Sequence, residues 1–246
     1  MRIYRFQIRI IQISVVLTAI ILAVAMVNVW QSGLETKPVA NNPTQTTPNN
    51  GNTEVEDPTA ANPEPAEEPL TNTRIVCLGD SFTVGYPGKV EDSWPAYVAQ
   101  TLEIEVINAG KTYQNSEDLL ARFDADVIAK DPGRVVIFAG VGDALRGKPL
   151  EEFQKNVIAM IEKAQANHIK PILALTLPFP GTDELYKAYR EWEEAYAAEN
   201  KITVLDFKTV LFDSDNKILD RYSDDGKYPN KDGYKAMGEY ASMILK

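Results

Sequence analysis

An alternation of short apolar runs with longer amphipathic segments over residues 73–246 constrains the fold more than any other feature. The apolar runs are 74–79, 104–109, 134–140, 171–177 and 202–207. The amphipathic segments are 93–102, 116–130, 149–167, 183–199 and 231–245, with the periodicity of helices that bury one face. Continuous apolar strands alternating with helices predict a parallel sheet that is covered by helices on both faces. Residues 73–246 should therefore form a single three-layer α/β domain.

The first predicted strand leads into a tight turn that carries a serine. Residues 74–79 are a buried strand in this interpretation, and Asp80, Ser81, Phe82 and Thr83 follow it directly. Ligands of parallel sheets bind at the carboxyl ends of the strands, and hydrolases expose a nucleophilic serine above a sheet in this way. Because a hydroxyl is a weak nucleophile without a base, a nearby proton acceptor is needed for catalysis by Ser81.

Capping residues mark several of the expected helix starts. Ser93 precedes Trp94-Pro95 and suits an N-cap with proline at the second helical position. Ser116 and Asn230 suit the same role before the helices at 116–130 and 231–245. These positions predict where the loops at the carboxyl ends of the strands finish.

The N-terminal 30 residues have the pattern of a membrane span. Arg2, Arg5 and Arg9 precede an uncharged, mostly apolar run at 10–30, about the ~20 residues that cross a hydrocarbon core. Positive charge before the span predicts a cytoplasmic segment 1–9, a transmembrane signal-anchor 10–30 and an exported remainder. Ala23-Val24-Ala25 resembles a cleavage site, so a removed signal peptide is the competing interpretation.

The next segment, residues 31–72, has the composition of a linker. It is rich in Pro, Asn, Thr, Glu and Ala and has almost no large apolar side chains. Such a chain cannot bury enough surface to offset its conformational entropy. We expect a disordered tether that holds the domain away from the lipid surface, so the predicted location is the cell membrane, single-pass, with an extracytoplasmic C-terminal domain.

Composition excludes several classes of function. Cys77 and His168 are the only cysteine and histidine, so they cannot build a structural zinc site, and Cys77 has no disulfide partner. We predict no metal and no cofactor. The net charge of −10 argues against a nucleic-acid partner and against electrostatic adhesion to anionic lipid. The expected membrane contact is the N-terminal helix alone.

A set of short motifs, in order along residues 73–246, resembles the GDSL or SGNH hydrolases. The matching segments are Gly79–Ser81, Gly85-Tyr86, Trp94–Ala96, Val106–Ala109, Leu120–Arg122, Ala144–Gly147, Asp224–Gly226 and Pro229-Asn230. The resemblance is closest to the bacterial periplasmic thioesterase and lysophospholipase branch. It implies a flavodoxin-like three-layer fold with a five-stranded parallel sheet, Ser81 as nucleophile and Asp225 as the acid that orients the base.

The departures from this family fall on catalytic positions. Tyr228 stands where the family has histidine, and a phenol with a pKa near 10 is a poor base at pH 7. Gly142 stands where the family has its oxyanion asparagine, a loss that typically costs ~100–1000-fold in rate. Tyr113 replaces the glycine whose backbone N–H is the other oxyanion donor. This change is the milder one, because tyrosine keeps an N–H, although its bulky side chain is expected to conflict with the backbone angles open to glycine.

Other residues are weighed as replacements for the histidine. His168 is expected at the amino end of the sheet, away from Ser81. Lys111 and Lys227 are the candidate substitute bases, since a desolvated lysine can lose its proton near pH 7. As ordinary solvated cations they would have no catalytic role. Asp225 has two alternatives, a hydrogen bond to the Tyr228 phenol or support of the turn before the last helix.

The other acidic residues are expected to have structural roles only. Asp143 should cap the turn after the third strand, and Glu193 should belong to one solvated helix face together with its charged neighbours Glu184, Glu191, Glu194, Lys187 and Arg190. Neither is predicted to take part in catalysis.

Three functions remain open from the sequence. The first is a catalytically impaired hydrolase relative that binds an acyl ester or a cell-envelope glycan as a ligand-binding or regulatory module. The second is an active serine esterase with a non-histidine base, for example one that deacetylates a wall polymer. The third is a structural interaction domain whose cleft is filled by Tyr113 and Tyr228.

Overall fold

The computed structural model describes residues 72–246, and these contain a five-stranded parallel sheet. The strands are β1 (Ile75–Gly79), β2 (Val106–Gly110), β3 (Arg134–Phe138), β4 (Lys170–Ala174) and β5 (Thr203–Leu205). Their order is β2-β1-β3-β4-β5, and every neighbouring pair is parallel. This is the flavodoxin-like order, so the predicted sheet is confirmed.

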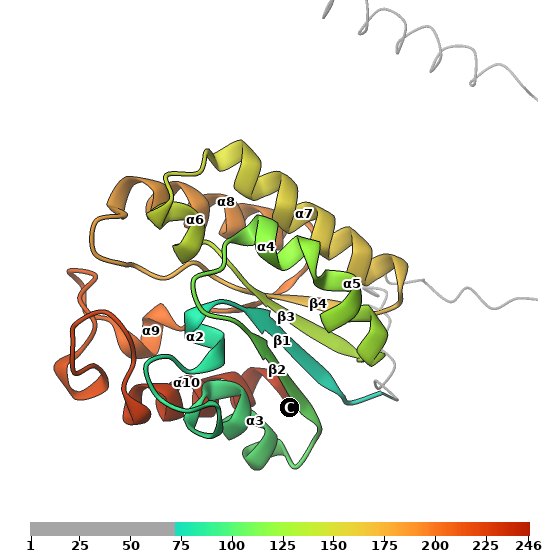
Figure 1. Cartoon of the computed structure of the whole chain (residues 1–246), viewed down its shortest axis with the longest axis horizontal. Coiled ribbons are helices and arrows are strands. Elements are labelled where there is room, and N and C mark those ends of the chain that lie inside the picture. Colours follow the sequence, from blue (N-terminus) through green and yellow to red (C-terminus); the bar gives the residue numbers. More distant parts are fainter. Residues whose placement is uncertain (1–71) are drawn as a thin grey trace, which may run out of the picture. The chain divides into compact units, whose positions relative to one another are not determined.

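Helices cover both faces of this sheet (Figure 1). One face carries α3 (Trp94–Leu102) and α10 (Lys231–Leu245), and the other carries α4 (Ser116–Ala121), α7 (Leu150–Ala166) and α8 (Asp183–Glu199). The short elements are α2 (Ser81–Val84), α5 (Phe123–Asp126), α6 (Val141–Leu145), α9 (Lys208–Leu211), η1 (Val90–Asp92), η2 (Ile128–Lys130) and η3 (Asp220–Tyr222).

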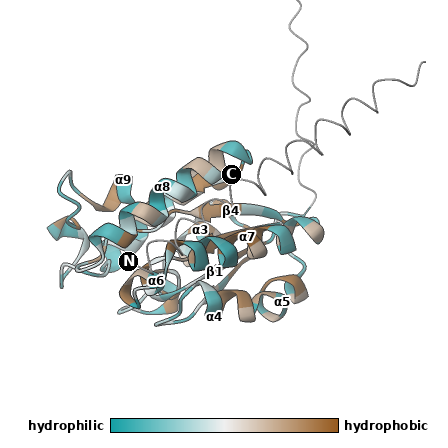
Figure 2. Ribbon diagram, turned by 90° about the horizontal axis from the view of Figure 1, so that it is seen from above, coloured by the Kyte–Doolittle hydropathy of each residue, from teal (hydrophilic) through white to brown (hydrophobic). Residues whose placement is uncertain are grey.

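Alternate side chains of β1, which lies between β2 and β3, enter two separate cores. Ile75 and Cys77 pack with α3 and α10, whereas Val76 and Leu78 pack with α4, α7 and α8. All four are fully buried. The alternation follows from the two-residue period of a strand. Burying each of the aliphatic side chains stabilises the fold by roughly 1.5–3 kcal/mol. The helices that cover them are amphipathic, with both hydrophobic and hydrophilic residues (Figure 2).

The helix predicted at 116–130 is wrong as a single element. The chain forms α4, α5 and η2 instead, with a break at Arg122, where φ is −108° and ψ is 6°. The freed Arg122 side chain donates to the carbonyl oxygens of Ala109, at 2.8 Å, and Gly79, at 3.0 Å. The break therefore ties this segment to the carboxyl ends of β1 and β2.

The capping predictions have mixed outcomes. Ser93 and Asn230 occupy N-cap positions as predicted, although only Asn230 accepts a capping hydrogen bond, from the N–H of Gly233 at 3.0 Å. Ser116 is not the cap of α4. Asn115 takes that role and forms a capping box with Asp118, because its side chain reaches the Asp118 N–H at 3.0 Å.

The predicted cytoplasmic segment 1–9, the anchor 10–30 and nearly all of the tether lie outside the described residues. Within residues 72–246, no helix has the length and apolar character needed to span a bilayer. Cys77 is buried, as expected. His168 is exposed and lies between α7 and the start of β4, so its predicted position at the amino end of the sheet is confirmed.

Candidate active site

The turn between β1 and α2 presents Ser81 as the first residue of α2. Asp80 is the N-cap, and its Oδ1 accepts from the N–H of Phe82 at 2.9 Å. The turn is tight: a Cβ on Gly79 would lie 2.0 Å from Oγ1 of Thr83, so glycine is required there. The resulting site lies at the carboxyl ends of β1 and β3, where the strand order reverses and ligands of such sheets bind.

The hydroxyl of Ser81 has a backbone donor beside it. The N–H of Tyr113 donates to Ser81 Oγ at 3.2 Å. Tyr113 adopts a left-handed backbone, with φ of 62°, and its side chain is 69% exposed. Its carbonyl oxygen accepts from the guanidinium of Arg146. The expected conflict between the tyrosine side chain and the angles of glycine is therefore wrong, because the ring projects outward while the N–H keeps its place.

Tyr228 packs among aromatic rings beside Ser81. Its ring lies 5.3 Å from the rings of Phe82 and Phe179 and 4.8 Å from Tyr86, measured between centroids. The phenol lies near the Ser81 hydroxyl, which acts to lower the pKa of Tyr228. Burial, followed by the nearby Asp80 carboxylate, raises the pKa of Tyr228 above its ordinary value of 10.0. A phenol that is neutral at pH 7 offers Ser81 a hydrogen bond but no strong proton acceptor.

Asp225 faces its own loop. Its Oδ1 accepts from the N–H of Lys227 at 2.8 Å and from the N–H of Tyr228 at 2.9 Å, and the Ser223 hydroxyl lies at 3.2 Å. Burial acts to raise the pKa of Asp225, but the hydrogen bonds from Tyr228 and Lys227 hold it below its ordinary value. These contacts support the second alternative from the sequence, in which Asp225 stabilises the turn before α10.

Gly142 leaves the site without a side-chain oxyanion donor. It is the second residue of α6, and a Cβ there would lie 2.0 Å from the carbonyl oxygen of Gln114. With the loop in this conformation no other residue fits. The close approach explains why this chain has glycine where the resemblance leads one to expect asparagine.

Asp143 has a larger structural part than the turn cap we expected. It is buried, and its carboxylate accepts from the N–H of Ser116 at 2.9 Å and from the Ser116 hydroxyl at 2.6 Å. Asn156 of α7 donates to the same hydroxyl at 2.9 Å. The network joins α6, α4 and α7, and it fixes the loop that carries Tyr113.

The prediction that Glu193 lies on a solvated helix face is wrong. Glu193 is buried on α8, and its carboxylate accepts from the N–H of Thr176 at 2.8 Å. Burial raises its pKa to about 8. The charge pattern of the helix did not distinguish this residue, since all five charged neighbours with which it was grouped are partly or fully exposed.

Asp80 is a titratable group whose state sequence reasoning did not address. It is buried, and burial raises its pKa to about 7, while the hydrogen bond from Phe82 acts in the opposite direction. It lies next to Ser81 in the chain and interacts electrostatically with Tyr228. The Gly-Asp-Ser motif marked the position but not its burial.

Neither candidate lysine contacts Ser81 in the described part of the chain. Nζ of Lys111 lies 2.9 Å from Oδ2 of Asp126, and the side chain is more than half exposed. Lys227 is exposed, and its side chain lines a pocket on the far side of Phe179. The structure therefore brings together Ser81, Tyr113, Gly142 and Tyr228 and leaves both lysines outside that group.

This sheet order, with a serine at the β1–α2 turn and a backbone donor from the following loop, defines a serine-hydrolase site of the SGNH type. The GDSL-like lipase/acylhydrolase family matches residues 77–236. The chain belongs to this family.

Solved structures and sequence relatives agree. A G-D-S-L family protein from Desulfitobacterium hafniense DCB-2 is 56% identical, with a TM-score of 0.69 over 70% of this chain and 99% of that one. Thioesterase 1/protease 1/lysophospholipase L1 of Escherichia coli K12 is 24% identical over 70% of this chain and 83% of its own length. The lipoprotein YqeF of Bacillus subtilis is 30% identical over 52% of this chain, and the match spans 58% of that protein.

Proposed function

We propose that this GDSL-family domain binds an acyl ester or acylated glycan and hydrolyses it poorly, acting as a ligand-binding or regulatory module. The observation that carries the proposal is the phenol of Tyr228, which packs on Phe82 beside Ser81 and is neutral at pH 7, in the place where a base is needed. The family's ester chemistry supplies the ligand class.

Catalysis by Ser81 depends on where its proton goes. For acylation, Ser81 Oγ must attack the ester carbonyl carbon while its proton passes to a base. The Tyr113 N–H can stabilise the oxyanion that forms, but Gly142 adds no second side-chain donor. Loss of the general base typically costs ~100–10,000-fold, and loss of an oxyanion donor ~100–1000-fold. Both deficits favour binding over turnover.

A second candidate is a working esterase with a non-histidine base. The retained Ser81–Tyr113 geometry favours it, as does the carboxyl of Asp80, whose pKa of about 7 is in the range of general bases. Asp80 is buried and its Oδ1 is held by the Phe82 N–H, so it would need to act through Tyr228.

The two candidates differ in serine-dependent turnover. We expect full-length protein in detergent to hydrolyse 4-nitrophenyl acetate no faster than Ser81→Ala. Tyr228→His should raise the rate by less than about tenfold, because groups of a catalytic unit act together. Ser81→Ala in the Tyr228→His background is the control. A serine-dependent wild-type rate of ~1–1000 per second would establish the esterase instead.

We also propose that the domain is displayed outside the membrane on a single N-terminal span. The support is the charge and hydropathy pattern of residues 1–30 and the linker composition of 31–72. Protease added to intact cells should then release the domain from its tether. Protection of the whole chain until the cells are lysed would reject this location.

A further inference from the structure

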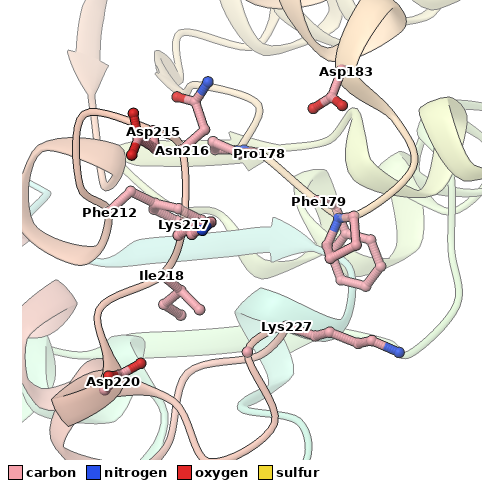
Figure 3. Close-up of a pocket in the computed structure, with 12 residues that line it drawn as sticks. Pro178, Phe179, Asp183, Phe212, Asp215, Asn216, Lys217, Ile218, Asp220 and Lys227 are labelled. Carbon is pink, nitrogen blue, oxygen red and sulfur yellow. The ribbon is translucent and has the colours of Figure 1, made fainter.

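A second cavity, of about 360 Å³, lies next to the Ser81 site (Figure 3). Three loops line it: 178–183 between β4 and α8, 212–220 after α9, and Gly226-Lys227 of the loop that holds Tyr228. Phe179 belongs to the cavity wall and also contacts the ring of Tyr228. A ligand in the cavity would therefore extend toward Ser81 past these two rings.

Local hydrogen bonds hold the walls of this cavity in place. Phe212 and Ile218 pair as an antiparallel bridge, and Asp213 Oδ1 accepts from the N–H groups of Asp215 and Lys217, both at 2.9 Å. On the opposite wall, the Thr182 hydroxyl donates to the carbonyl oxygen of Phe179 at 2.8 Å. A preformed cavity binds with a smaller entropy loss than one that must be ordered by its ligand.

The polar side chains around the cavity are not used by the fold. None of the salt bridges among residues 72–246 includes the five charged lining residues, which are Asp183, Asp215, Asp220, Lys217 and Lys227. Oδ1 of Asn216, another lining residue, is buried and has no hydrogen-bond partner. Hydrogen-bond acceptors and donors thus line the same cavity.

Apolar surfaces lie between these polar groups. Phe179 stands on one side of the cavity and Phe212 on the other, and Ile218 lies between them in Figure 3. Flat apolar walls with polar groups at their edges match a molecule that has apolar faces and a rim of hydroxyls. A sugar ring has this form: its C–H faces pack on aromatic rings, and its hydroxyls both donate to carboxylates and accept from ammonium groups.

Other ligand classes fit this lining poorly. An acyl chain would remove water from Asn216 and the charged groups without replacing their hydrogen bonds, which is costly. A metal ion needs converging ligands, and no three His, Cys, Asp or Glu side chains of the described residues are grouped to hold one. The carboxylates are instead spread around the cavity.

We infer that this cavity binds the carbohydrate part of the ligand, so that the substrate class of the site is an O-acylated saccharide and not an acyl lipid. Only the placement of the acyl group at Ser81 rests on the proposed function. The carbohydrate itself binds between Phe179 and Phe212, whether or not Ser81 reacts.

Saturation-transfer difference NMR tests the inference with three unacylated probes: tri-N-acetylchitotriose, xylotriose and mannotriose. Full-length protein in detergent should transfer saturation to at least one of them. Asp183→Ala/Asp220→Ala should weaken that binding about tenfold, since two hydrogen-bonding groups are lost. Asp124→Ala, on α5 and outside the cavity lining, should leave it unchanged.

Ser81→Ala separates this inference from the proposed function, because it should abolish any ester turnover and leave sugar binding intact. No transfer to any of the three probes would overturn the inference. So would transfer that persists unchanged in the Asp183→Ala/Asp220→Ala variant, because the sugar would then bind elsewhere. Circular dichroism of each variant verifies that the fold is retained.

Discussion

The two sides of the Ser81 site differ in what maintains them. On the serine side, the position of the nucleophile follows from backbone geometry: the close approach at Gly79, the cap at Asp80 and the N–H of Tyr113. The base and the second oxyanion donor depend instead on single side chains, at the positions of Tyr228 and Gly142. Backbone donors survive a change of side chain, whereas a base does not.

The two aspartates of the site repeat this contrast electrostatically. Burial raises the pKa of Asp80 to about 7 on the serine side. Asp225, on the other side, is exposed and has a lowered pKa because backbone N–H groups bind it, in opposition to its slight burial. One carboxyl is kept protonated by its surroundings at mildly acidic pH, and the other is kept ionised.

The largest effect should come from Asp80. The folded protein keeps its proton up to a pH of about 7, whereas the unfolded chain loses it near 3.8, so the free energy of unfolding should fall as the pH rises across this window. The slope is at most about 1.4 kcal/mol per pH unit, or up to about 4 kcal/mol in total. Asp80→Asn keeps a capping oxygen and should remove this contribution, so that urea unfolding between pH 4 and pH 8 shows a smaller fall; the buried Glu193, whose pKa is also raised, accounts for the part that remains.

Asp225→Asn is the matched comparison for Asp80→Asn. Because the pKa of Asp225 is lowered, its contribution is present above its ordinary pKa of 3.8 and is lost as the pH falls below that. The change should be small, since Asp225 is solvated. Equal pH profiles for Asp80→Asn and wild type would remove the electrostatic contrast between the two sides.

A smaller effect is expected from Gly142→Ala. The added Cβ would meet the carbonyl oxygen of Gln114 at 2.0 Å, so the Tyr113 loop must shift, at a cost of about 1–3 kcal/mol in unfolding free energy. Gly88→Ala is the control, because its nearest neighbour would lie at 3.2 Å. If Gly142→Ala lowers the unfolding free energy no more than Gly88→Ala does, the Tyr113 loop can move to accommodate the side chain, and asparagine can be restored at Gly142 without strain.

The fold was predictable from the sequence because its signals are local and repeated. Apolar runs located all the strands, and four of the five helices predicted from amphipathic segments are present, since each burial pattern is a property of its own segment. The break at Arg122 was missed, because its cause is a side chain that bonds to carbonyl oxygens of distant strands. Short helices such as α2 and α6 have too few residues to show a period.

The site was predictable only in part. Motif order gave Ser81, Tyr113, Gly142 and Tyr228, and the structure places them together. Sequence could not give the left-handed backbone of Tyr113 or the burial of Asp80 and Glu193, because each depends on what packs above it. The cavity that includes Phe179 was also not predictable, since its walls come from three separate segments of the chain, 178–183, 212–220 and 226–227.

The last helix of the chain supports the first turn of the site. The phenol of Tyr234, in α10, donates to the carbonyl oxygen of Tyr86 at 2.5 Å and approaches that of Ser81 at 3.5 Å, and α10 packs on α3. During synthesis the serine turn leaves the ribosome before α10 has been made, because translation runs from the N-terminus at roughly 5–20 residues per second. The nucleophile therefore reaches its final setting only after the C-terminal residues have left the ribosome, and a nascent or C-terminally truncated chain would carry an incomplete site.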